Sequence, residues 1–175
     1  MIYALPDAAR RERLLPAVIG WNVRYAWRYG EVYATPDFAG AAVWLTPGNT
    51  TMTLGRMLRA GLWQAPLTVE WSLLRRLAGV WDSAAELQRR HAPMAHWYLS
   101  QIGVEPLSQG HGLGSALLRP MLAHLDANQE WCYLETAEAS NLPFYRHLGF
   151  AVVDESSVGH GRVPVWALLR QPGPA

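Results

Sequence analysis

The chain has 175 residues, of which half are hydrophobic and 17% are charged. This length and balance predict one globular domain, and a net charge of +1 gives no electrostatic reason to expect a nucleic-acid partner. The only cysteine, Cys132, excludes an internal disulfide, and no apolar run reaches the ~18 residues of a membrane helix. We therefore expect a cytoplasmic protein that binds neither nucleic acid nor membrane.

The first predicted element is a helix over residues 7–29. Asp7 is suited to the N-cap, and Pro16 is expected to break the helix in two. Apolar side chains recur at helical spacing and predict a buried face: Leu14, Val18, Trp21 and Tyr25.

The next two elements form a predicted hairpin. The runs "GEVYA" (30–34) and "GAAVWLTP" (40–47) are β-like and flank a turn that contains Pro36 and Gly40. Residues 51–90 are expected to be mainly helical, with interruptions near Gly61 and Pro66.

The second half has sharper signals. Strands are predicted over 96–104, 130–136, 150–155 and 162–170, and helices over 112–127 and 141–149. The order strand, helix, strand, helix, strand, strand predicts an α/β domain with a partly parallel sheet.

The two helices of this half have recognisable ends and faces. Pro120 is expected to bend the first helix, whose apolar face is formed by Leu113, Leu117, Leu118, Met121, Leu122 and Leu125. In the second, Asn141 fits the N-cap, Pro143 the first turn, and Gly149 a left-handed stop.

The stretch "LSQGHGLGSALL" (107–118) places Gly110, Gly112 and Gly114 between a strand and a helix. A helix N-terminus presents free N–H groups and a partial positive charge, and bare glycines let phosphate oxygens approach. The spacing is neither the G-x-G-x-x-G dinucleotide fingerprint nor a P-loop. We infer a diphosphate ligand.

Read from Gln109, "QGHGLG" fits Q/R-x-x-G-x-G/A and resembles the pyrophosphate loop of the GNAT superfamily of N-acyltransferases. The element "NLPFY" (141–145) followed by "LGF" (148–150) resembles the later motif of that family. Residues 95–170 are especially similar to the puromycin N-acetyltransferases and their unassigned relatives. The resemblance implies a mixed, partly parallel sheet flanked by helices, without the strand and helix that usually open the fold.

The resemblance also implies acetyl-CoA as co-substrate. It implies a single domain over residues 1–175, in which residues 5–94 form the acceptor side and residues 95–170 bind acetyl-CoA. The expected contacts of the cofactor are Ile102, Gly103, Val104, Gln109, Gly110, Gly112, Leu113, Gly114, Ser115 and Asn141.

The catalytic residues implied are Tyr145, as general acid to the CoA sulfur, and Glu135, as the base that takes the proton of the amine. Tyr145 lies one helical turn after Asn141, and Glu135 shares a strand face with Tyr133. Tyr145 could instead pack against the sheet, and Glu135 could be solvated or bind the amine without catalysis.

His160 and His96 are alternative bases. His91 and His96 do not have the helical spacing of a metal site, so no metal is expected.

Acceptor specificity is expected from aromatic side chains of the front half, which would suit an aromatic or bulky amine unless they fill the core. These are Trp21, Tyr25, Trp27, Trp63, Trp71 and Trp81. The predicted function is acetyl transfer to a primary amine of a small molecule by direct attack in a ternary complex. The alternative is a catalytically silent CoA-binding sensor. A homodimer would cover the sheet edge that a missing first strand exposes.

Overall fold

The computed structural model describes residues 7–61, 63, 71–158 and 163–173. The main elements are α1 (Ala8–Tyr29), β1 (Gly30–Ala34), β2 (Gly40–Leu45), α2 (Leu54–Arg59), α4 (Trp71–His91), β3 (His96–Val104), α5 (Leu113–Ala127), β4 (Trp131–Thr136), α6 (Leu142–His147), β5 (Ala151–Val158) and β6 (Val163–Arg170). Short 3-10 turns over Pro106–Ser108 and Ala139–Asn141 precede α5 and α6. Among the described residues, no helix is both long and apolar enough to cross a bilayer.

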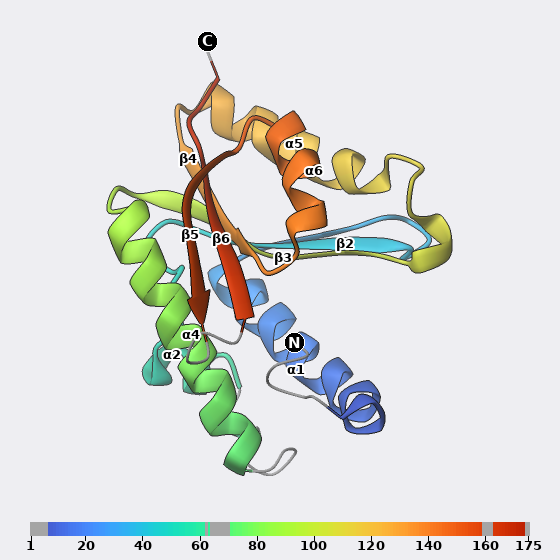
Figure 1. The fold of residues 1–175 in the computed structure, drawn as a ribbon, viewed down its shortest axis with the longest axis vertical. Helices are drawn as coiled ribbons and strands as arrows, with labels where there is room; N and C mark the ends of the chain where they lie inside the picture. The colour runs from blue at the N-terminus through green and yellow to red at the C-terminus, as the bar shows by residue number, and fades with distance from the viewer. Residues whose placement is uncertain (1–6, 62, 64–70, 159–162, 174–175) are drawn as a thin grey trace.

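The strands form one six-stranded sheet in the order β1-β2-β3-β4-β6-β5 (Figure 1). Neighbouring strands are antiparallel except β3 and β4, which are parallel and are connected through α5. The sheet is therefore mixed, as predicted, and the expected hairpin of β1 and β2 is confirmed.

Alternation along β2 assigns the helices to opposite faces of the sheet. Ala42 and Trp44 belong to the core under α5 and α6, whereas Val43 and Leu45 pack with α1. The predicted apolar faces of α1 and α5 are both buried, and Cys132 is fully buried beside α5. α4 covers the α1 face further along the sheet and contacts β5 and β6 (Figure 1).

The sheet splits open between β3 and β4. These strands pair only from His96–Trp131 to Tyr98–Tyr133, after which β3 stays with β2 and β4 stays with β6. Figure 1 shows the two groups of strands running in different directions beyond this point. The edge of β3 that faces β4 is thus left unpaired by the sheet from Leu99 onward.

The expected break at Pro16 is wrong, because α1 continues through it. Pro16 lies on the exposed side of α1, where solvent can hydrate the backbone carbonyl that Pro16 leaves without an N–H donor. On the other side of α1, Val18 and Trp21 pack against α4. α5 also continues through Pro120. In the region predicted as interrupted helix, α2 ends before Gly61, while Pro66 lies outside the described residues.

Candidate active site

One cavity lies where β3 passes into α5, and it gathers all ten of the cofactor residues predicted from the sequence. The end of β3, the glycine loop, the first turn of α5 and the start of α6 line it. The lining residues are Ile102, Gly103, Val104, Ser108, Gln109, Gly110, Gly112, Leu113, Gly114, Ser115, Asn141, Phe144 and Tyr145. We call this the loop cavity.

The loop presents backbone amides as the glycine pattern predicts. The first hydrogen bond of α5 runs from Ala116 N to the Gly112 carbonyl, so the preceding amides of the first turn have no helical acceptor. Gly110 and Gly112 have φ of 79° and 78°, and a Cβ at either would meet nothing within 4 Å. These glycines therefore provide the left-handed backbone and leave the space in front of the amides open.

Gly114 and Gln109 have roles that differ from those of the other loop residues. A Cβ at Gly114 would approach Phe144 Cζ to 3.3 Å, so Gly114 lets α6 pack closely against α5. Gln109 Nε2 donates to the Val104 carbonyl at 3.0 Å and thereby closes the loop onto β3. Both residues shape the loop cavity through packing within the chain.

A register shift in β3 supplies a feature that sequence patterning missed. Val43 pairs with Gln101 and Trp44 with Leu99, so Ser100 is an extra residue on β3. The shift reverses the alternation beyond it: Ile102 and Val104 pack toward α5, while Gln101 lines the cavities of the other face. A bulge of this kind has no local sequence signature here.

Tyr145 is buried against Phe144 and Phe150, with its exposure down to 6%. The packing that the sequence offered as an alternative is therefore present, yet Tyr145 also lines the loop cavity and the hollow beside it. Burial raises the pKa of its hydroxyl to about 12. At neutral pH Tyr145 carries its proton and can donate it.

Glu135 stands at the end of β4, on the other side of the split. Tyr98 OH donates to Glu135 Oε2 at 2.7 Å, while Oε1 is buried without a partner among the described residues. Burial raises the pKa of the Glu135 carboxyl to about 7, although the Tyr98 hydroxyl opposes this by stabilising the ionised form. A carboxyl of this pKa exchanges protons readily near neutral pH.

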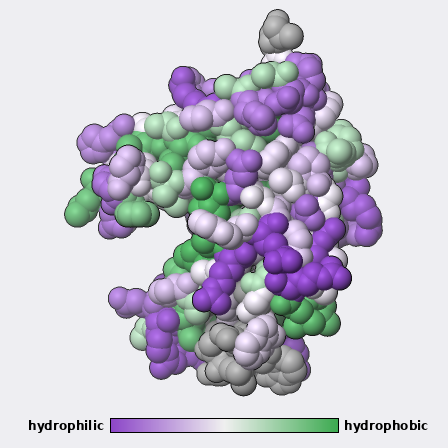
Figure 2. Space-filling view, turned by 180° about the vertical axis from the view of Figure 1, so that it is seen from behind, coloured by the Kyte–Doolittle hydropathy of each residue, from purple (hydrophilic) through white to green (hydrophobic). Residues whose placement is uncertain are grey.

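Tyr145 and Glu135 lie on the same hollow, at the opening between β3 and β4. A hollow lined by both Tyr145 and Glu135 shares Ile102, Gly103 and Asn141 with the loop cavity. In Figure 2 the molecule is deeply notched, and hydrophobic side chains gather along the inner wall of the notch. The loop cavity and the region around Glu135 are therefore continuous through the opening between β3 and β4.

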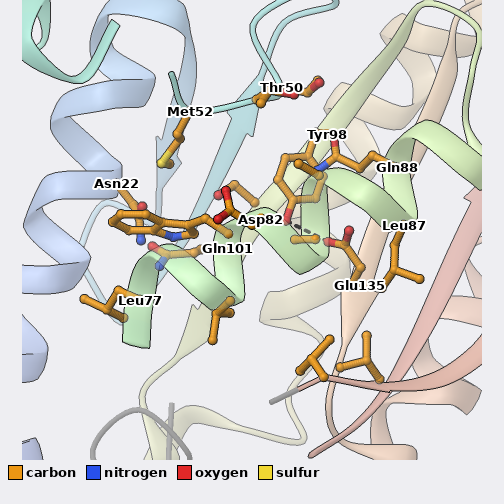
Figure 3. Close-up of a pocket in the computed structure, with 18 of the residues that line it drawn as sticks. Asn22, Thr50, Met52, Leu77, Asp82, Leu87, Gln88, Tyr98, Gln101 and Glu135 are labelled. Atoms are coloured by element: carbon orange, nitrogen blue, oxygen red, sulfur yellow. Dashed lines mark hydrogen bonds between the residues drawn. The ribbon is translucent and has the colours of Figure 1, made fainter. Parts of the chain in front are cut away.

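Beyond Glu135 lies a further cavity of about 340 Å³, covered by α1 and α4 (Figure 3). We call it the acceptor-side cavity. Glu135, Ser100, Gln101 and Thr136 line both it and the hollow that holds Tyr145. Figure 3 shows the bond between Tyr98 and Glu135 at this cavity, with Gln88 beside Tyr98 and with Gln101 further along, near Asp82.

The expected N-cap role of Asn141 needs correction. Asn141 occupies the N-cap position of α6, but its side chain does not cap the helix and instead donates to Thr136 Oγ1 at 3.4 Å. The preceding 3-10 turn already places Asn141 in helical conformation, which removes the extended geometry that a capping side chain needs.

Of the alternative bases, His96 lines none of the three cavities described above. It is buried against Tyr133, its Nδ1 lies 2.8 Å from the Met94 carbonyl, and burial lowers its pKa. His160 lies outside the described residues.

For the aromatic residues of the front half, the alternative of core packing holds better than an aromatic pocket. Trp81 lines the acceptor-side cavity, but Tyr25 is fully buried and donates to backbone carbonyls of the 49–51 segment. Trp27 and Trp63 are exposed, and Trp21 packs in the core between α1 and α4. The side chain of Trp71 is not described. Most of these aromatic residues serve packing, and the polar members of the site, Tyr98, Gln88 and Gln101, were not predicted.

Residues 75–152 match the family model described as an acetyltransferase (GNAT) domain. The chain is 29% identical over 152 residues to an uncharacterised N-acetyltransferase of Schizosaccharomyces pombe. That alignment covers 82% of this chain and 60% of the relative, so the chain spans less than two thirds of the relative's length.

Solved structures share the fold at low sequence identity. A Corynebacterium glutamicum structure, described as histone acetyltransferase HPA2 and related acetyltransferase, superposes with a TM-score of 0.58 and 17% identity, over 99% of this chain and 88% of the other. A Chaetomium thermophilum protein in complex with a bisubstrate analogue superposes with a TM-score of 0.52 and 12% identity, over 87% of this chain and 72% of the other.

Proposed function

Since residues 75–152 match the model of an acetyltransferase (GNAT) domain, we propose that the chain transfers an acetyl group from acetyl-CoA to a primary amine of a small molecule. The observation that carries the proposal is that the loop cavity is continuous with a hollow, and that Tyr145 and Glu135 both line this hollow. We further propose that both halves of the chain act as one catalytic domain of a cytoplasmic protein.

The residues present fit acetyl-CoA, which would supply the acetyl thioester. The open amides of the glycine loop and the first turn of α5 suit a pyrophosphate, because they are unused donors at the positive end of a helix dipole. The unpaired edge of β3 at Ile102, Gly103 and Val104 suits the amide groups of a pantetheine arm, because extended backbone groups there lack a neighbouring strand.

Glu135 prepares the acceptor. Most amines enter as ammonium ions, so a proton must leave before the nitrogen can attack. The buried Glu135 carboxylate binds the ammonium group and takes that proton, and its raised pKa makes it a stronger base than an exposed glutamate.

Tyr145 completes the exchange of protons. The amine nitrogen forms its bond to the acetyl carbon as the carbon–sulfur bond breaks, and the sulfur receives the Tyr145 proton. The acylated nitrogen then gives up its second proton, which restores the proton of Tyr145 directly or through solvent. Glu135 releases the first amine proton to solvent, so both groups return to their starting states.

The cavity volume supports a small acceptor. The acceptor-side cavity, at about 340 Å³, is near the lower end of the ~300–1,000 Å³ range of ligand pockets. A catalytically silent CoA sensor remains the second candidate, and it would need the loop cavity but neither Glu135 nor Tyr145 at the split.

The test compares the wild-type chain with Tyr145→Phe in a thiol-release assay with acetyl-CoA and a panel of amines. We expect amine-dependent release that falls by about 10²–10⁴-fold in the variant, because the general acid is lost. Calorimetry should give both proteins the same affinity for CoA within about twofold, a difference of about 0.4 kcal/mol. CoA binding without amine-dependent release from any amine would favour the sensor.

A further inference from the structure

The acceptor-side cavity has an uneven distribution of charge. Its ionisable lining residues are Asp82, Glu135 and Tyr98, and none of the described residues that line it is basic. All 15 basic residues of the chain are arginines, and none of the described ones enters the lining. The described walls therefore provide negative charge and polar groups without a cation of their own.

The two carboxylates occupy different depths. Glu135 lies at the inner end, where the cavity joins the hollow of Tyr145, and its Oε1 is buried without a partner. Asp82 is exposed on α4, and no described side chain bonds to it. Figure 3 shows both residues on the same cavity.

Unused polar capacity lies near the inner carboxylate. Gln88 is 4% exposed, lines the cavity, and leaves its Oε1 without a partner among the described residues. A buried acceptor of this kind costs free energy unless a donor reaches it, so the cavity is built for a ligand that brings N–H groups.

Apolar side chains line other parts of the cavity wall. Val18, Met52, Leu77 and Trp81 belong to the walls contributed by α1, the 50–52 segment and α4. A ligand that satisfies the whole cavity carries one nitrogen for Glu135, a second cationic nitrogen for Asp82, and apolar groups that face these walls.

We propose that the acceptor is a small diamine, and that Asp82 selects it by pairing with the nitrogen that is not acetylated. The proposal rests on the proposed acetyl transfer and adds the class of substrate and a specificity-determining residue. Asp82 does not take part in the proton transfers, because Glu135 and Tyr145 perform them at the other end of the cavity.

The experiment measures kcat and KM for a homologous series of terminal diamines and for the matching monoamines, with acetyl-CoA held at saturation. For the wild type we expect the best diamine to exceed its monoamine by about fivefold or more in kcat/KM, the value of one solvent-accessible ion pair. The chain contains no lysine, so no lysine side chain of its own competes for the acetyl group.

Asp82→Asn should raise KM for the diamine about threefold to fivefold with kcat unchanged, and should leave the monoamine unchanged. Asp82→Arg should raise the diamine KM further, because it places a like charge at the outer end. Glu86→Gln is the matched control: it removes one negative charge from the same helix, but Glu86 pairs with Arg89 and Arg90 and does not line the cavity.

Calorimetry of terminal diaminobutane and butylamine, each added to the CoA-loaded chain, reports the preference without turnover. Tighter binding of the diamine that disappears in Asp82→Asn supports the proposal. Equal binding and equal kcat/KM for the two amines, or a short peptide with a higher kcat/KM than any diamine, would overturn it while leaving acetyl transfer intact. If the wild-type chain binds the diamine but no amine accelerates thiol release from acetyl-CoA, the proposed function is refuted instead.

Discussion

In the proposed reaction, proton transfer depends most directly on the contact between Tyr98 and Glu135. The 2.7 Å bond stabilises the ionised carboxylate in a site where burial favours the neutral acid. Tyr133 and Gln88 lie beside the same carboxylate, and the Tyr133 hydroxyl and Gln88 Oε1 are buried without partners among the described residues. Tyr98 thus donates directly to Glu135, and Tyr133 and Gln88 complete the polar surroundings of the carboxylate.

Tyr98→Phe should raise the pKa of Glu135 further, since it removes a donor to the charged form. A base acts when ionised, so activity rises as pH increases through this pKa, and the acidic limb of the kcat/KM profile should move to higher pH by about one unit. Tyr33→Phe is the control, because Tyr33 donates to Glu31 of β1 and lines none of the three cavities described above. An acidic limb that stays in place in Tyr98→Phe would show that Glu135 is not the titrating base.

At the scale of elements, the proposed binding of a pyrophosphate depends on the junction of β3 and α5. Gly112→Val forces a β-branched residue to φ 78°, and places its side chain in the open space before the amides. We expect the affinity for CoA, measured by calorimetry, to fall at least about tenfold, the loss of ~1.4 kcal/mol or more of binding.

Gly48→Val separates strain from blockage. Gly48 has φ 79° and open space around its Cβ, as Gly112 does, but it lies in the turn after β2 and outside the loop cavity. Both variants should lose about 1–2 kcal/mol of stability from the left-handed backbone, while only Gly112→Val loses CoA affinity. Equal CoA affinity in the two variants would contradict a pyrophosphate site at this loop.

The elements also show which parts of the site a sequence can predict. Gly149 was predicted correctly as a left-handed stop, because a left-handed φ at the end of a helix depends on neighbouring residues. The bulge at Ser100 and the missing side-chain cap at Asn141 were not predicted. The bulge depends on the pairing of β3 with β2, and the cap is lost because of the 3-10 turn before α6. Local rules fail where a neighbouring element determines the backbone.

At the scale of the whole molecule, long-range contacts limited prediction most. Tyr98 and Glu135 are 37 residues apart, and their bond exists because parallel β3 and β4 separate just beyond Tyr98. The topology could be inferred from the order of elements, but the residue at which the strands separate could not. Asp82 and Gln88 reach the cavity only because α4 lies over that opening.

An ion pair between Arg170 and Asp126 joins β6 to α5. Arg170 of β6 donates through both terminal nitrogens to Asp126 of α5, at 2.6 and 2.7 Å, and Gly173 N donates to the same carboxylate at 2.6 Å. The side chains are only 12% and 30% exposed, and the bond from Arg170 holds the pKa of Asp126 below its ordinary value. This pair joins α5 to the sheet on the side opposite the glycine loop.

Asp126→Asn should lower the free energy of unfolding by about 1–3 kcal/mol near neutral pH, because the charge-assisted fork is lost. Since the folded-state pKa of Asp126 is lowered, the unfolded chain binds the extra proton at acidic pH. The stabilisation is therefore complete above the ordinary aspartate pKa and disappears as pH falls through the lower, folded value.

Urea unfolding at about pH 7 and about pH 3 measures the loss of stability and its pH dependence, provided the chain still unfolds in one step. Glu86→Gln, which removes an exposed pair, should cost less than about 1 kcal/mol at either pH. A cost for Asp126→Asn that does not change with pH would mean that packing, and not the charge of Asp126, holds α5 to β6.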